Sequence, residues 1–147
     1  MRYMIFVKAN KDTEAGKFPL EPELTRLFSA MAAYHEDLTK AGVLLDASGL
    51  QPSSKGFKVK YSGNKRAIVD GPFAEAKELV AGYWVWEVKS MDEALEWVMQ
   101  CPDPMPGEES ELEIRPFYEP EDFGENLTPE HRAKVDELRA NASHSHN

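Results

Sequence analysis

The chain has 147 residues, of which 41% are hydrophobic and 29% charged, and its formal net charge is −9. This composition is typical of a folded globular domain and excludes global disorder. A surface with 26 acidic against 17 basic residues repels phosphate backbones and anionic lipid, so we expect neither nucleic acid nor a membrane as partner. Cys101 is the single cysteine and cannot form an intramolecular disulfide, and no apolar run is long enough for a bilayer. These features predict a cytoplasmic protein.

The first half of the chain predicts two strands around one long helix, followed by a hairpin. In order, we expect a strand at residues 2–8, a polar loop at 9–20, a helix at about 23–41, a short strand at 43–47 and a hairpin at 57–61 and 66–69. The first strand is apolar on both faces, which favours an interior position in a sheet. Gly42 is a typical C-terminal stop for the helix.

The long helix carries a histidine near the centre of its apolar stripe. The stripe follows the helical repeat and consists of Leu24, Leu27, Phe28, Met31, His35 and Leu38. His35 is explained either as a core residue with one hydrogen-bond partner or as an acid/base group facing a pocket. The second interpretation is open because the pKa of histidine lies near neutrality and shifts with burial.

The stretch at residues 70–78 joins the hairpin to the next strand. It reads Asp70-Gly71-Pro72-Phe73-Ala74-Glu75-Ala76-Lys77-Glu78. Gly and Pro favour a turn here, and the dense charge behind the turn has two explanations. The stretch is either a solvated loop anchored by Phe73 or the lining of a small-molecule pocket that includes Asp70.

The second half of the chain predicts a strand, a helix, a strand and a terminal helix. We expect the strand at residues 82–88, a helix that begins at Ser90, a strand at 111–118, an acidic loop at 119–124 and a helix from 128 to about 140. The strand at 82–88 has Tyr83 and Val85 on one face and Trp84, Trp86 and Val88 on the other. Both faces need cover, and a partner subunit would supply what the helices do not.

Together these elements predict an α+β fold with a ferredoxin-like antiparallel sheet, two helices on one face, an extra hairpin and a C-terminal helix. We expect a domain at residues 1–120 and an extension at 121–147 that ends in a frayed tail from Ser143 to His146. The tail histidines lack the three or four converging ligands of a metal site, so no metal is expected.

The stretch at 70–78 resembles the signature of the DGPF group of YCII-related proteins. Further matches occur in the order of the family and cover roughly residues 1–118: Arg2-Tyr3-Met4, Gly42-Val43-Leu44, Gly49-Leu50-Gln51-Pro52, Gly82-Tyr83-Trp84, Asp92-Glu93-Ala94 and Glu113-Ile114-Arg115-Pro116. The resemblance implies a homodimer of the dimeric α/β-barrel type. It also implies suspected lyase or isomerase activity without a general cofactor, and frequent association with extracytoplasmic-function sigma factors.

Two positions depart from the pattern of the family. Ala76 stands where the motif usually has threonine, which removes a hydroxyl group. The helix histidine suspected of catalysis in the wider family corresponds to Met31 here, and His35 follows one turn later.

These residues lead to two hypotheses about function. The first is a cofactor-independent lyase or isomerase that acts on a small carbonyl or carboxylate compound, with Asp70 as general acid or base and His35 as second proton carrier. Arg115 or Lys77 would hold a substrate anion, Tyr83 would offer its phenol, and Glu75 would help to raise the pKa of Asp70. The second hypothesis is a non-catalytic ligand-binding or regulatory dimer in which the motif is structural.

Overall fold

The computed structural model describes residues 1–144, except for the side chains of Lys77, Ser143 and His144. The tail predicted beyond His144 lies outside the described residues. The chain divides into two compact units, of which the first is Met1–Pro116 and the second begins at Phe117. Among residues 1–144 there is no helix whose length and apolar character would let it cross a bilayer.

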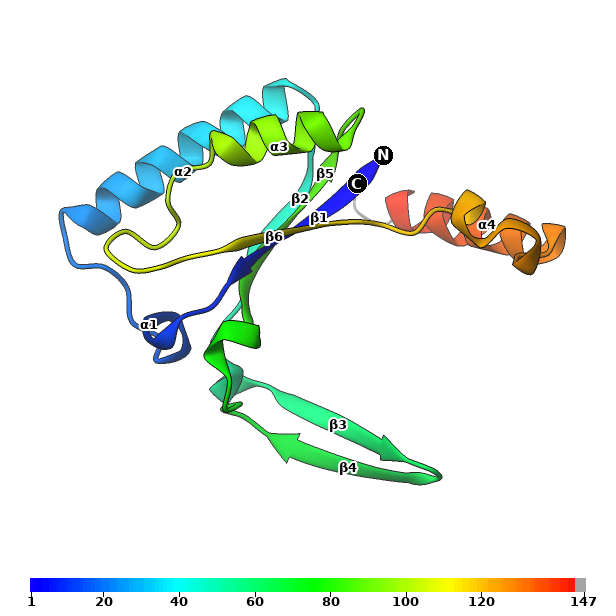
Figure 1. Cartoon of the computed structure of the whole chain (residues 1–147), viewed down its shortest axis with the longest axis horizontal. Helices are drawn as coiled ribbons and strands as arrows, with labels where there is room; N and C mark the ends of the chain where they lie inside the picture. Colours follow the sequence, from blue (N-terminus) through cyan, green and yellow to red (C-terminus); the bar gives the residue numbers. More distant parts are fainter. Residues whose placement is uncertain (145–147) are drawn as a thin grey trace. The chain divides into compact units, whose positions relative to one another are not determined.

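The first unit is built on a four-stranded antiparallel sheet. Its strands are β1 (Arg2–Lys8), β2 (Leu44–Gly49), β5 (Val80–Glu87) and β6 (Leu112–Pro116), in the order β2-β5-β1-β6. The helices α2 (Glu23–Lys40) and α3 (Met91–Met99) lie on the same side of this sheet (Figure 1). The predicted ferredoxin-like α+β fold is therefore confirmed, with β1 as an interior strand.

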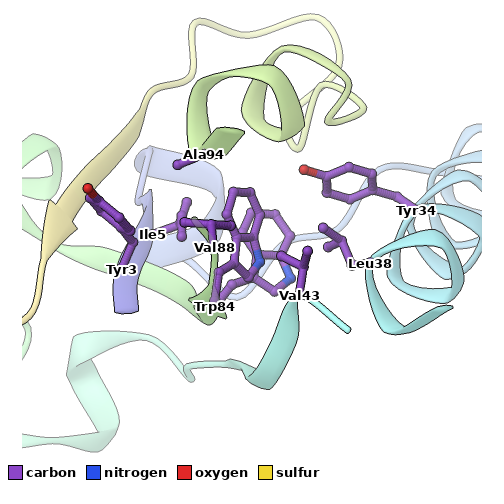
Figure 2. Close-up of a cluster of buried hydrophobic side chains, with 9 residues drawn as sticks. Tyr3, Ile5, Tyr34, Leu38, Val43, Trp84, Val88 and Ala94 are labelled. Atoms are coloured by element: carbon purple, nitrogen blue, oxygen red, sulfur yellow. The ribbon is translucent and has the colours of Figure 1, made fainter. Parts of the chain in front are cut away.

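The core lies between the sheet and the two helices. Tyr3 pairs with Trp86 and Ile5 with Trp84, so these four side chains leave one face of the sheet together. They meet Tyr34 and Leu38 of α2 and Ala94 of α3, which are also buried (Figure 2). The hydroxyl of Tyr34 donates to the carbonyl oxygen of Trp97 at 2.6 Å and so ties α2 to α3. The alternation predicted for residues 82–88 is confirmed.

The apolar stripe of α2 has two parts with different surroundings. Leu38 is fully buried in the core beside Tyr34, whereas Leu24, Leu27 and Met31 are only half-buried. Phe28 is exposed over 59% of its surface. The C-terminal part of the stripe therefore packs in the core, and its N-terminal part lines a cavity described below.

The strands β3 (Phe57–Ser62) and β4 (Lys65–Asp70) form the predicted hairpin as a separate two-stranded sheet. The prediction of an unbroken loop at residues 9–20 is wrong, because Lys11–Glu14 form the short helix α1. Asn10 and Thr13 cap this helix reciprocally, with Thr13 N–H donating to Asn10 Oδ1 at 2.9 Å and Asn10 N–H donating to Thr13 Oγ1 at 2.9 Å. Two reciprocal bonds stabilise a helix too short to show periodicity.

The second unit contains a run of 3₁₀ turns at Pro120–Asn126, where an acidic loop was expected, and the helix α4 (Pro129–His144). Arg139 Nη1 lies 2.9 Å from Glu119 Oε2, and Arg132 pairs with Glu121. These exposed ion pairs connect the helix to the turns that precede it.

Candidate functional site

A pocket of about 830 Å³ lies beside α2, on the helix side of the sheet. Its size falls within the range of small-molecule sites. Helix α2 forms one wall with Glu23, Leu24, Leu27, Phe28, Met31 and His35. Strand residues that include Val7, Ala47, Gly82 and Trp84 contribute a second wall. The remainder is supplied by α1 with the segment after it, and by the loop at residues 104–108.

Local hydrogen bonds hold in place the two remaining parts of the pocket wall, α1 and the loop at residues 104–108. Asn10, which caps α1, also has its side-chain nitrogen 2.8 Å from the sulfur of Met105 in the opposite loop. Asp103 Oδ1 accepts from the backbone N–H of Met105 at 2.9 Å and from the hydroxyl of Ser110 at 3.0 Å. Because Met105 is buried and both loops are tied to it, the pocket has a defined border on this side.

His35 contributes the one imidazole among the residues that line the pocket. Its Nε2 accepts a hydrogen bond from the indole N–H of Trp84 at 2.7 Å, and the two rings meet edge-on. An indole nitrogen can only donate, so Nε2 carries no proton and the neutral ring is protonated at Nδ1. Burial lowers the pKa of His35. Near neutral pH the ring is therefore an uncharged donor through Nδ1–H.

The charged residues of the pocket are predominantly acidic. Asp12, Glu23 and Glu108 line it with a single cation, Lys17, and all four are exposed at its mouth. Deeper positions are mainly apolar. A site with this balance attracts neutral or cationic groups and repels free carboxylates. Among residues 1–144 no three His, Cys, Asp or Glu side chains are grouped as a metal site requires.

Tyr83 also lines the pocket, but its phenol is engaged elsewhere. Its hydroxyl donates to Asp46 Oδ2 at 3.1 Å, and this hydrogen bond, with the negative charge of Asp46, raises the pKa of Tyr83. Because strand side chains alternate, the ring of Tyr83 leaves the sheet on the face opposite Trp84. The contact of Tyr83 with the pocket is therefore assigned to its backbone.

The stretch at residues 70–78 is a clasp at the root of the hairpin. Phe73 N–H donates to the hydroxyl oxygen of Ser53 at 3.0 Å, and Gly71 N–H donates to the carbonyl of Gly56 at 3.0 Å. Ser53 in turn donates its hydroxyl and its N–H to the carboxylate of Glu14, the latter at 3.1 Å. We call this set of bonds, which joins Glu14, Ser53, Gly56, Gly71 and Phe73, the hairpin clasp.

Gly71 has a steric reason to be glycine. A Cβ atom there would lie 1.7 Å from the carbonyl oxygen of Ser53. The ring of Phe73 lies under the ammonium of Lys58, which is 4.1 Å from the ring centroid. These contacts place residues 70–73 at the base of the hairpin, where Asp70 is exposed.

The structure brings two of the six predicted site residues to one pocket. His35 and the backbone of Tyr83 line it, whereas Asp70, Glu75 and Arg115 do not and are exposed. The side chain of Lys77 is not described. The roles predicted for these residues stay predictions. The sequence reasoning missed the walls around Asn10 and Met105, for which the Asn10–Thr13 capping pattern was the available signal.

The sheet order, the two helices on one face and the pocket beside α2 define a ferredoxin-like α+β protein with a cavity of small-molecule size. The chain belongs to the family of the YCII-related domain, whose model matches residues 1–118. An uncharacterized protein of Rhizobium meliloti (strain 1021) is 30% identical to it over 97 residues, which cover 65% of this chain and 77% of that protein.

Proposed function

We propose that the pocket beside α2 binds a small, largely apolar carbonyl compound, and that His35 donates a hydrogen bond from Nδ1 to the oxygen of that compound. The observation that carries the proposal is the bond from Trp84 to Nε2, because it leaves a neutral imidazole with its proton on Nδ1 in the wall of a cavity of about 830 Å³. The acidic mouth favours a carbonyl compound over a free carboxylate.

Thermal shift measurements with paired compounds test this proposal. Each small ketone, aldehyde or lactone is compared with the carboxylate of matching size, on the wild type, on His35→Phe and on His131→Gln, which alters an exposed histidine of the second unit. A ligand at 100 times its Kd stabilises the native state by about 2.7 kcal/mol. We expect this stabilisation for carbonyl compounds in the wild type and His131→Gln, and its loss in His35→Phe. Equal shifts in all three proteins would contradict the role of His35.

Lyase or isomerase chemistry is a second candidate, favoured by the neutral state of His35. A neutral imidazole N–H can polarise a carbonyl group while a base removes the neighbouring proton. Asp70 remains the proposed base, and it reaches this pocket only if another copy brings it there. Exchange of the ligand's α-proton with deuterated solvent, followed by proton NMR, tests this candidate. Asp70→Asn should abolish the exchange and leave binding intact, and exchange at the wild-type rate in this variant would contradict the role of Asp70.

We further propose that the protein is a homodimer and, on the strength of residues 70–73, a member of the DGPF group. Support for the dimer comes from the sheet face opposite α2 and α3. Met4 and Phe6 of β1 lie there beside Val85 and Tyr83 of β5, and all four remain partly exposed. No helix of the first unit covers them. Sedimentation should give a dimer at micromolar concentration, and a monomer there would contradict this proposal.

A further inference from the structure

The hairpin β3–β4 is amphipathic. Residues that pair directly across an antiparallel ladder share a face, and Val59 pairs with Ile68 and Tyr61 with Arg66. One face therefore carries four apolar residues, Phe57, Val59, Tyr61 and Ile68, together with Arg66 and Asp70, and we call it the apolar face of the hairpin. The opposite face carries Lys58, Lys60 and Lys65 with Ser62, Ala67 and Val69.

The apolar face has no cover in the protomer. Every residue of the two strands is exposed, and Phe57, Tyr61 and Ile68 keep 64%, 69% and 71% of their surface accessible. A two-stranded hairpin on its own is marginally stable in water. Clustered apolar side chains on a surface mark a site of interaction. Both arguments indicate that the hairpin packs against another molecule.

Charge and surface complementarity indicate what that molecule is. Residues 57–70 hold four basic and one acidic side chain, a net charge of +3, while the rest of the chain carries −12. A second copy therefore attracts the hairpin electrostatically. It also offers the open sheet face, where Met4, Phe6 and Val85 lie among Arg115, Glu113 and Asp46 without a helix of their own unit over them.

The hairpin clasp makes the hairpin suitable as an arm. Gly71 bonds to Gly56 across the base of the two strands, and Phe73 bonds to Ser53, which is held by Glu14 of α1. The root is therefore anchored to α1 while the strands remain accessible. An anchored arm loses less conformational freedom on docking than a loose loop would.

We propose that β3–β4 is a docking arm whose apolar face packs on the open sheet face of a second copy of this chain. The inference rests on the proposed homodimer and adds to it the segment that holds the two copies together. It also requires the dimer to weaken at high salt, because opposite charges on arm and body contribute to association.

Sedimentation of the full-length chain tests the arm through the variant Tyr61→Lys/Ile68→Lys. Central apolar contacts are worth about 2 kcal/mol each, or about a 30-fold change in Kd for each substitution. We therefore expect the double variant to be monomeric where the wild type is dimeric. Met99→Lys is the matched control, since Met99 is an exposed apolar residue of α3 away from both proposed surfaces (77% exposed). It should dimerise as the wild type does.

Hydrogen exchange of the wild-type protein gives a second readout that depends on no substitution. Amides of residues 57–70 should become protected when the protein concentration rises through the dimer Kd. A wild-type monomer at all concentrations refutes the homodimer and the arm together. A dimer whose hairpin amides stay unprotected, or whose affinity survives the double substitution, refutes the arm and leaves the homodimer standing. Either result is independent of ligand binding at His35.

Discussion

Substitution of Gly71 by alanine tests the structural account of the hairpin clasp. The new Cβ would lie 1.7 Å from the carbonyl oxygen of Ser53 and 2.5 Å from its carbon, whereas real Cβ atoms essentially never approach within 3.0 Å. The backbone must therefore retreat by at least 1.3 Å, the difference between 3.0 and 1.7 Å. Both obstructing atoms belong to the main chain, so no side-chain rotation relieves the clash.

The expected cost combines strain with lost hydrogen bonding. Overpacking of this kind costs about 1–3 kcal/mol. Displacement of Gly71 also breaks its bond to Gly56, worth about 0.5–1.5 kcal/mol. We expect Gly71→Ala to lower the free energy of unfolding by about 2–4 kcal/mol, which corresponds to roughly 8–16 °C in Tm at about 4 °C per kcal/mol. Urea denaturation and thermal unfolding measure the two quantities.

Gly49→Ala is the matched control. Its Cβ would meet only the carbonyl oxygen of Ala81, at 4.0 Å, in an ordinary strand conformation. We expect a change within about 0.5 kcal/mol, as for a substitution that creates neither strain nor a cavity. If Gly71→Ala were as stable as this control, and the amide of Phe73 exchanged no faster than in the wild type, the steric argument would be refuted.

Three further predictions concern single groups. Because burial lowers the pKa of His35 from 6.5, the unfolded chain binds a proton that the native chain does not, so stability falls as the pH drops below 6.5. His35→Gln should flatten this dependence in urea unfolding series, and an unchanged slope would contradict it. Tyr34→Phe removes the hydrogen bond to the carbonyl oxygen of Trp97, which also accepts from the N–H of Gln100. The free energy of unfolding should fall by about 1 kcal/mol in the same assay, and an unchanged value would show that the bond contributes nothing to stability. Burial and the charge of Asp103 raise the pKa of Cys101 from 9.0 to about 11, so a thiol reagent at pH 8 should react about 100-fold more slowly with native than with unfolded protein, and similar rates would refute this.

The sheet could be predicted from the sequence because its strands alternate cleanly. Ile5 faces the core beside Trp84, as the period of two requires, and Gly42 ends α2 with a positive φ of 72°. Both patterns are local, because the conformation of each residue depends on its own side chain and its immediate neighbours in the sequence. The ferredoxin-like fold class followed from the order of the strands and helices along the chain.

The pocket could not be predicted in the same way. Helical periodicity identified the apolar face of α2 but not what lies opposite it, so Leu24 and Leu27 could not be told apart from the buried Leu38. The bond between His35 and Trp84 joins residues 49 positions apart, and no local pattern reports it. Asp70 was placed at a site because of its charged neighbours, yet hydrogen bonds of Gly71 and Phe73 decide where that turn lies.

Because of the hydrogen bond between Gly71 and Gly56, the length of the hairpin can change without a change in the core. The two ends of the hairpin are joined by this bond, in which Gly71 N lies 3.0 Å from the carbonyl oxygen of Gly56, before the chain continues toward β5. Adding one residue pair to the strands would extend the tip by about 3.4 Å and leave the pocket untouched. Insertions or deletions of residue pairs can therefore lengthen or shorten the hairpin while the four-stranded sheet stays the same.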